Sequence, residues 1–272
     1  MLRLLSALLL VALASASGQP SFRPSIRVVN GTSAVPHSWP WQAMVLFEQD
    51  GALYFICGGT LIDPDWVMTA GHCFPYNGTY WVLLGGHNIT NIGGNQQIIP
   101  GEKIYVHPNY DDNNASKGND IALLKLSTSA KLTDKVKPIC PPPRDYILPH
   151  GTECYITGWG TTSTGGSIPD ILQQGLLPVV DYAHCSQPDW WGSSVKETMV
   201  CAGGANVAGC NGDSGGPLNC PGVKCEWEVN GVASFVSIEG CDTLKKPTVF
   251  TRVSAYIDWI IGIIGGYPKC SC

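Results

Sequence analysis

Short apolar runs, each bounded by turn-forming residues, recur along most of the chain and restrict it to few folds. Each run is four to eight residues long and rich in Val, Ile, Thr and aromatic residues, as in WVMTA, IALLKLS and TVFTRV. Gly, Pro, Asn and Asp separate the runs, and the 272 residues include 32 Gly and 20 Pro. Runs of this length and spacing are typical of an all-β sandwich or barrel. Strands do not alternate with long helical patterns, which argues against an α/β fold.

A single helix is predicted, near the C-terminal end of the chain. In VSAYIDWIIGII, residues 253–264, apolar side chains recur at helical spacing, and Ser254 is a candidate N-cap. Further upstream, the Pro-rich stretch 137–151 divides the strand-rich region into two unequal parts. We therefore expect two β-units joined by a linker at about 137–151, with a C-terminal α-helix packed against the β-core.

The N-terminal end has the composition of a secretory signal peptide. Residues 1–17 hold an early positive charge, then an apolar run, then small residues suited to cleavage. The apolar run is too short to span a bilayer, and no other run is long enough. Residues 18–27 are polar and end in Arg27. They are predicted to be an activation propeptide in front of a domain that covers 28–272.

The composition excludes several classes of partner. Twelve cysteines behind a signal peptide predict disulfide bonds, not free thiols. The net charge of −5 argues against nucleic acid as a partner. The six histidines are scattered along the sequence, so no metal site is expected. We expect a secreted, extracellular monomer with neither a membrane nor a nucleic-acid partner.

The motif GDSGG places Ser214 between glycines, as in sites that expose a nucleophilic serine. It also fits the G-x-S-x-G elbow of α/β-hydrolases, which needs its catalytic histidine after the serine. All six histidines instead precede Ser214: His37, His72, His87, His107, His150 and His184. The hydrolase fold is therefore excluded, and the remaining chain orders are Asp–His–Ser and His–Asp–Ser.

The order His–Asp–Ser has the better candidates. His72 lies in VMTAGHC after a strand-like run, where Cys73 can pin its turn. Asp120 lies in NDIALLKL at the start of an apolar strand, where a carboxylate can be buried against an imidazole. The acidic residues that precede His72 have no comparable setting, so the order Asp–His–Ser is harder to support.

Several motifs together resemble the chymotrypsin-like serine proteases. They are VVNG after Arg27, SWPWQ, CGGTLI, TAGHC, NDIALLKL, CYITGWG, GCNGDSGGP and KPTVFTRV, in the order of that family. The resemblance runs from Arg27 to about Ile261 and is strongest to the pancreatic elastases, the elastase-3 type in particular. It implies two packed six-stranded antiparallel β-barrels with the catalytic site between them.

The resemblance assigns a role to each candidate of the catalytic site. Ser214 would be the nucleophile of a serine endopeptidase, and His72 its general base and acid. Asp120 would orient His72, and the backbone N–H groups of Gly212 and Ser214 would form the oxyanion hole. The implied substrate is a polypeptide, cleaved through an acyl-enzyme, and no cofactor is expected.

Activation is also implied by the resemblance. A trypsin-like protease would cleave the zymogen after Arg27 and free the α-amino group of Val28. In this family that amine pairs with the carboxylate that precedes the nucleophile, here Asp213. A buried carboxylate without a partner is costly, so the pairing can order the oxyanion hole and the pocket.

The residues that match the family's primary pocket indicate a small side chain at P1. Ala208, six residues before Ser214, brings no charge to the base, which argues against Arg and Lys. The resemblance assigns Ser234 to the same pocket. Val236 and Thr248 stand where an open pocket has glycines, so the slot is expected to take Ala, Val or Leu.

Two alternatives to an elastase remain open. One is an active protease with a chymotrypsin-like preference at P1. The other is a catalytically inactive homologue that only binds, although all three triad candidates are present.

The resemblance further implies a set of disulfides. Four pairs follow the family pattern: Cys57–Cys73, Cys154–Cys220, Cys185–Cys201 and Cys210–Cys241. Of the other four cysteines we pair Cys140 with Cys225, while Cys270 and Cys272 fit no family pattern.

Two further features concern surface loops. Gly86 and Gln96 stand where several relatives carry the acidic ligands of a calcium ion, so no calcium site, or a weak one, is expected. Four sequons are candidates for glycosylation: Asn30, Asn77, Asn88 and Asn114.

Overall fold

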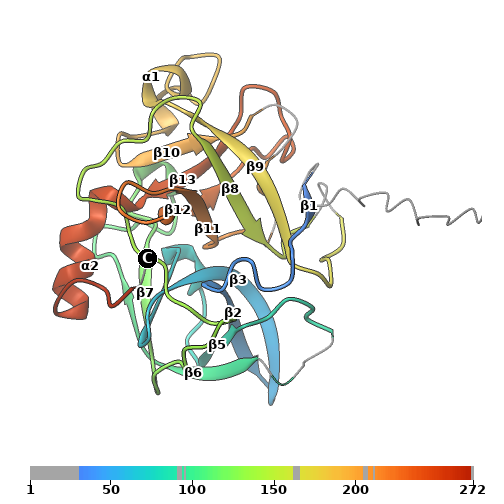
Figure 1. Cartoon of the computed structure of the whole chain (residues 1–272). Coiled ribbons are helices and arrows are strands. Elements are labelled where there is room, and N and C mark those ends of the chain that lie inside the picture. The colour runs from blue at the N-terminus through green and yellow to red at the C-terminus, as the bar shows by residue number, and fades with distance from the viewer. Residues whose placement is uncertain are drawn as a thin grey trace, which may run out of the picture.

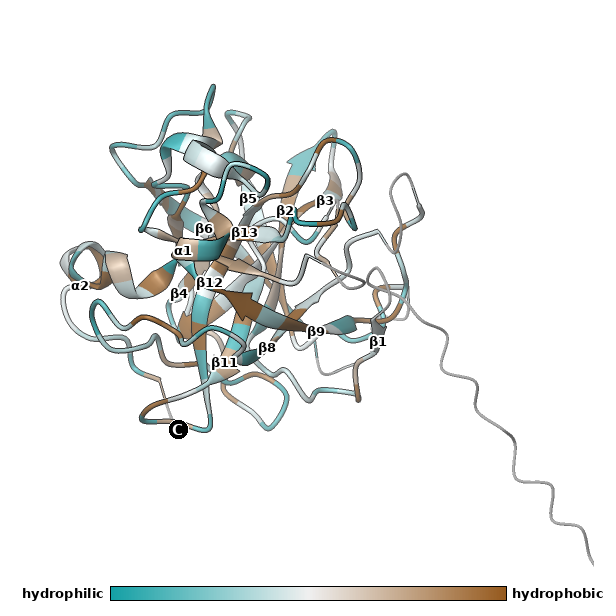
Figure 2. Ribbon diagram, turned by 90° about the horizontal axis from the view of Figure 1, so that it is seen from above, coloured by the Kyte–Doolittle hydropathy of each residue, from teal (hydrophilic) through white to brown (hydrophobic). Residues whose placement is uncertain are grey.

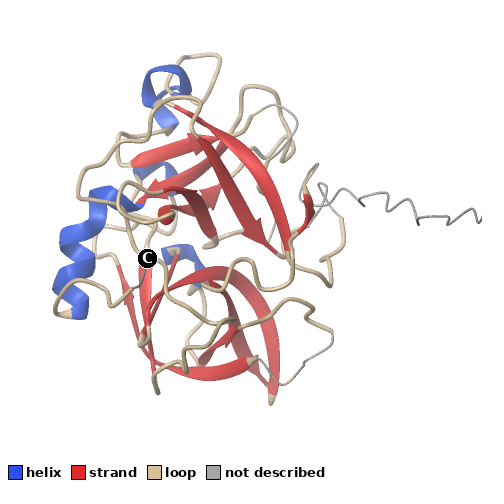
Figure 3. Cartoon of the chain, viewed as in Figure 1, coloured by secondary structure: helices blue, strands red, loops and turns tan. Residues whose placement is uncertain are grey.

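The computed structural model describes residues 31–90, 94, 96–161, 166–204, 208–210 and 212–270. The predicted signal peptide, the propeptide and the Arg27–Val28 bond lie outside these residues, as does the sequon at Asn30. Strands dominate the described chain, and the few helices are short (Figure 3). The strands form two barrels that lie one above the other in Figure 1.

The first barrel is built from consecutive strands of the N-terminal half. They are β2 (Gln42–Gln49), β3 (Ala52–Asp63), β4 (Trp66–Thr69), β5 (Tyr80–Leu84), β6 (Gln97–Val106) and β7 (Ala122–Leu126). The sheet closes in the order β2-β3-β4-β7-β6-β5, and every pairing is antiparallel. Closure removes the free edges that an open sheet would expose.

The second barrel uses the later strands and one short early strand. They are β1 (Thr32–Ser33), β8 (Glu153–Gly158), β9 (Gln173–Val180), β10 (Met199–Ala202), β11 (Pro217–Pro221), β12 (Trp227–Phe235) and β13 (Thr248–Arg252). Strands β9-β10-β13-β12-β11-β8 close into a ring through the β8–β9 pairing, and β1 adds to β9. The prediction of two six-stranded antiparallel barrels is therefore confirmed.

Each barrel encloses its own apolar core. Val45, Val67 and Leu124 are fully buried in the first, and Leu218 and Phe250 in the second. Figure 2 shows hydrophobic stretches on strands of both barrels. The short apolar runs of the sequence thus supply the inward faces of the strands.

The helices sit outside the barrels. The C-terminal helix α2 (Ile257–Ile264) follows a 3-10 turn and lies at the flank of the molecule in Figure 1. The predicted cap at Ser254 is wrong, because Tyr256 occupies the N-cap position. Ser254 instead donates its hydroxyl to the Tyr146 carbonyl, 2.6 Å away, which ties the segment between β7 and β8 to the helix. Among the described residues, no helix is both long and apolar enough to cross a membrane.

The four disulfides expected from the family pattern are present. They are Cys57–Cys73, Cys154–Cys220, Cys185–Cys201 and Cys210–Cys241. The pairing of Cys140 with Cys225 is wrong.

Cys140 is bonded to Cys270 instead. Cys140 lies beside Glu228 of β12, whereas Cys225 belongs to the turn before that strand. The segment after α2 folds back onto the first barrel, where the Lys269 N–H donates to Asp63 at the end of β3, 2.7 Å away. This path brings Cys270 to Cys140. Cys225 is itself disulfide-bonded.

Candidate active site

His72 is presented by a 3-10 turn, Gly71–Cys73, at the end of β4. The disulfide from Cys73 to Cys57 fixes this turn to β3. Thr69 strengthens the connection, because its hydroxyl donates to the Gly58 carbonyl at 2.8 Å. The imidazole is therefore carried by a short segment with little freedom, and its side chain remains 27% exposed at the surface.

Asp120 is fully buried two residues before β7 and contacts His72 twice. One carboxylate oxygen accepts the His72 backbone N–H at 3.0 Å, and the other lies 2.8 Å from His72 Nδ1. The preceding Asn119 has φ of 61°, a left-handed conformation that Asn adopts more readily than most residues. This turn aims the carboxylate at the imidazole and fixes the orientation of the ring.

Ser214 comes from the second barrel and is held against the turn of His72. Its carbonyl accepts the Gly58 N–H at 2.8 Å. Gly215 has φ of 74°, and a Cβ there would lie 2.1 Å from Thr69 Oγ1 and 3.0 Å from Cys73 Sγ. Only glycine permits this approach, which brings the serine loop and the histidine turn together.

Gly212 and Asp213 complete the serine loop. Gly212 has φ of 95°, and a Cβ there would lie 3.0 Å from the Gly160 Cα. Asp213 is 2% exposed and accepts N–H groups from Gly160 at 3.0 Å and Cys210 at 2.9 Å. Loss of hydration raises the pKa of Asp213 to about 6, and the two backbone hydrogen bonds oppose that shift.

A cavity of about 190 Å³ opens beside Ser214. It is lined by Gly209, Cys210, Asp213, Ser214, Ala233, Ser234, Phe235, Val236 and Thr248. Ser234, Val236 and Thr248, which the resemblance assigns to the primary pocket, all line this cavity. Ala208, expected at the base of the pocket, does not line the cavity. It is buried and directly precedes Gly209, whose N–H donates to Thr248 Oγ1 at 2.9 Å.

The structure adds contacts that no sequence motif indicated. Ser234 was expected only as a pocket residue, but its hydroxyl also donates to the Asp120 carboxylate at 2.5 Å. Thr251 donates to the Asp120 carbonyl at 2.7 Å. Both lie on strands of the second barrel, so they join Asp120 of the first barrel to its neighbour. A hydroxyl within an apolar strand gives no signal of such a contact.

The loop that carries a calcium site in some relatives brings no carboxylate at Gly86 or Gln96. A Cβ at Gly86 would lie 3.0 Å from Leu83 and 3.6 Å from Trp159, so the backbone is closely packed there. The Gln96 amide donates across the loop to the Asn88 carbonyl at 3.2 Å. The absence of a calcium site stays a prediction.

Comparisons with known proteins agree with this geometry. The trypsin family model matches residues 28–260. Human chymotrypsin-like elastase family member 3B is 60% identical over 262 residues, which cover 96% of this chain and 97% of the relative. Human member 3A is 58% identical with the same coverage, and bovine proproteinase E is 59% identical over 89% of this chain and 96% of its own length.

Relatives that are 58–60% identical over nearly the whole chain establish the family. The first barrel carries the His72–Asp120 pair, and the second barrel holds the serine loop against it. The match to the trypsin family covers both barrels, so it agrees with this arrangement. The chain belongs to the trypsin family of serine endopeptidases, within its elastase-like group.

Proposed function

We propose that the chain is a secreted zymogen which, once cleaved, hydrolyses peptide bonds after small aliphatic residues through an acyl-enzyme on Ser214. The observation that carries this proposal is the buried Asp120 carboxylate 2.8 Å from His72 Nδ1, with the serine loop packed against the same turn. The name of the bovine relative, proproteinase E, also indicates a precursor for that protein.

The chemistry follows from what a serine hydroxyl needs at neutral pH. Ser214 Oγ attacks the scissile carbonyl carbon while His72 Nε2 takes its proton. Asp120 holds the proton on Nδ1 and stabilises the imidazolium that forms. His72 then protonates the leaving amine as the C–N bond breaks, and a water molecule hydrolyses the ester in the second half of the cycle.

The developing oxyanion is assigned to the N–H groups of Gly212 and Ser214. The positive φ of Gly212 supports this role. Residues other than glycine rarely adopt this conformation, so the sequence keeps a glycine where the backbone of the serine loop has to turn. In other serine proteases the loss of one such donor costs about 3–4 kcal/mol of transition-state stabilisation.

The preference at P1 is inferred from the cavity beside Ser214. Val236 and Thr248 place β-branched side chains on its lining, and the buried Ala208 next to Gly209 in the chain brings no charge. Asp213 also lines the cavity, but after cleavage its charge is assigned to the Val28 amine. A basic P1 side chain would then have no free carboxylate, and a large aromatic ring would overlap the walls.

Peptide substrates that differ only at P1 test this preference in the trypsin-cleaved enzyme. With Ala at P1 we expect kcat/KM to exceed the value with Phe at P1 by at least about tenfold. One methylene group too many or too few in an apolar pocket already changes kcat/KM by about 10–200-fold. Measurement on matched anilides would show it. A higher value with Phe would establish the chymotrypsin-like alternative.

The buried carboxylate of Asp213 predicts how pH affects the uncleaved precursor, in which Val28 has no free amine. The pKa of Asp213 is raised from 3.8 to about 6, so the folded state binds more protons than the unfolded state between these values. The contribution of Asp213 to the free energy of unfolding is therefore fully present below pH 3.8. It is lost as pH rises through about 6, which lowers the free energy of unfolding by about 3 kcal/mol.

This effect can be isolated with Arg27→Gln, which blocks cleavage, and with the same chain carrying Asp213→Asn. Urea unfolding between pH 4 and pH 7 should show the decline in the first chain and a flatter profile in the second. Identical pH profiles for the two chains would contradict the assignment to Asp213.

A further inference from the structure

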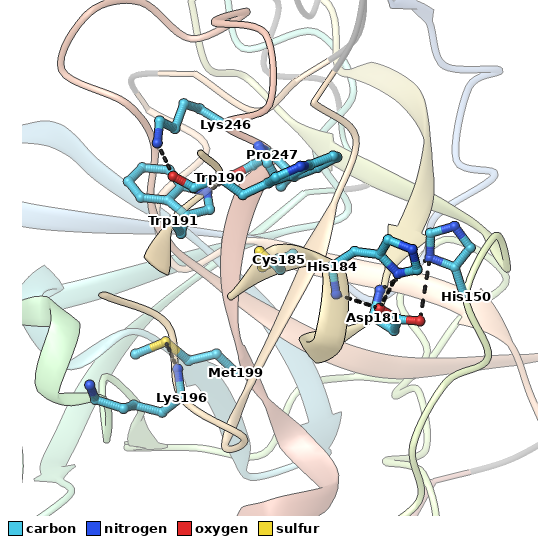
Figure 4. Close-up of a disulfide and its surroundings, with 11 residues drawn as sticks. His150, Asp181, His184, Cys185, Trp190, Trp191, Lys196, Met199, Lys246 and Pro247 are labelled. Carbon is cyan, nitrogen blue, oxygen red and sulfur yellow. Dashed lines mark hydrogen bonds and ion pairs between the residues drawn. A yellow bond between two sulfur atoms is a disulfide. The ribbon is translucent and has the colours of Figure 1, made fainter. Parts of the chain in front are cut away.

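Two histidines that are distant in sequence meet at one carboxylate on the second barrel. His184 Nδ1 lies 2.6 Å from one Asp181 oxygen, and His150 Nδ1 lies 3.8 Å from the other. The two imidazole rings are stacked, with centroids 4.7 Å apart and planes inclined by 28°. Figure 4 shows both rings directed at Asp181. One potential ligand atom from each of the three side chains lies within 4.8 Å of the others.

The backbone around this cluster is already fixed. Asp181 is the N-cap of the short helix α1 (Tyr182–Cys185), and its side chain accepts the His184 N–H at 2.9 Å. Cys185 is fully buried and bonded to Cys201 of β10. His150 is held through its neighbour in the chain, because the Gly151 N–H donates to the Val179 carbonyl of β9 at 2.8 Å. A ligand would therefore meet side chains on a rigid frame and would order little of the chain.

The chemistry of the three groups suits a transition-metal cation. Hydrogen bonds from the His184 backbone and ring lower the pKa of Asp181, so its carboxylate is ionised at neutral pH. Neutral imidazole offers a nitrogen lone pair, which at His184 Nδ1 becomes available when the proton shared with Asp181 moves to Nε2. A pair of imidazoles with one carboxylate suits zinc and its neighbours better than calcium or magnesium. Side-chain exposures of 53% for His150, 33% for Asp181 and 51% for His184 leave access from solvent and space for water ligands.

One other group of metal-ligating residues occurs in the described chain, and it differs in chemistry. His72 lies close to Cys57 and Cys73, but those two cysteines are bonded to each other. A disulfide sulfur is not the thiolate that binds metals. No sequence motif indicated the first cluster, because strands β8 and β9 and the loop between them separate His150 from Asp181.

We propose that His150, Asp181 and His184 form a binding site for a zinc-like divalent transition-metal ion. The ion would join the segment before β8 to α1, which lies at the outer end of the second barrel in Figure 1. Its ligands would be the two imidazoles and the carboxylate, with water in the remaining positions. The site is separate from the triad and does not depend on the assigned P1 preference.

Calorimetric titration of the uncleaved full chain with Zn²⁺ at pH 7.5 tests the proposal. We expect the wild-type chain to bind one more Zn²⁺ than the double variant His150→Gln/His184→Gln. Either single variant removes one ligand and should weaken this event by at least about tenfold, since even the loss of a hydrogen-bond partner of a ligand costs about 10–100-fold in metal affinity. Binding at His72 or elsewhere would appear equally in all chains, so the difference reports this cluster alone.

Two matched variants make the test specific. Asp181→Asn keeps the N-cap acceptor of α1 while removing the charge, so it should fold normally and bind Zn²⁺ more weakly. His37→Asn removes a histidine elsewhere and should bind like the wild type. Identical titrations of the wild-type chain and the double variant would overturn the proposal and leave a hydrogen-bonded His–Asp–His cluster only.

Discussion

The Asp120→Asn variant is expected to lose about 10⁴-fold in kcat after activation, while it folds and binds substrate as before. Asp120 accepts two hydrogen bonds from His72, and one of them involves Nδ1. An asparagine amide would donate to Nδ1 and so force the imidazole proton onto Nε2. That nitrogen could then no longer take the proton of Ser214. Steady-state kinetics on a P1 Ala anilide would measure the loss.

Ser234→Ala is the matched control for this variant. It removes the hydroxyl that donates to Asp120 at 2.5 Å, but it leaves both contacts between Asp120 and His72 in place. We expect a far smaller reduction in kcat than for Asp120→Asn. If the two variants lost activity equally, the tautomer of His72 would not be what Asp120 controls.

Removal of side-chain bulk from the cavity should change the P1 preference. In Val236→Gly combined with Thr248→Ser, the slot gains space while the remaining hydroxyl can still accept the Gly209 N–H, as Thr248 does at 2.9 Å. We expect kcat/KM for P1 Phe relative to P1 Ala to rise by about 10–200-fold. Parallel assays of the two anilides would give this ratio.

Val236→Thr controls for any change at this position, since threonine has nearly the same shape as valine. Its Phe-to-Ala ratio should stay close to that of the parent enzyme. An unchanged ratio in the enlarged variant would show that Val236 and Thr248 do not set the preference, although they line the cavity.

Much of the fold could be predicted because its determinants are local. Apolar runs of strand length, separated by turn residues, indicated the strands, and VSAYIDWIIGII indicated the helix. The closure of two barrels came from the resemblance, since strand order depends on pairing between distant segments. The N-cap was wrong because Ser254 uses its hydroxyl to hold the Tyr146 carbonyl, a contact made by the tertiary fold.

The candidate site also contains residues that the sequence indicates and residues that only the structure shows. His72, Asp120 and Ser214 lie in motifs that a reader of the sequence can find. The hydroxyls of Ser234 and Thr251 reach Asp120 only after the second barrel packs on the first, and no local pattern indicates this. Cys140 was paired with Cys225 because the path of the chain after α2 is not encoded locally, whereas that path brings Cys270 to Cys140.

We propose that cleavage after Arg27 makes Ser214 a nucleophile. The most direct measurement is to incubate the chain with an organophosphate fluoride before and after limited trypsin treatment, and to locate the label by peptide mass spectrometry. We predict one phosphoryl group per cleaved chain, on Ser214, and almost none on the precursor or on Ser214→Ala. A correctly cleaved chain that stays unlabelled at Ser214 would contradict activation by cleavage and favour a homologue that only binds.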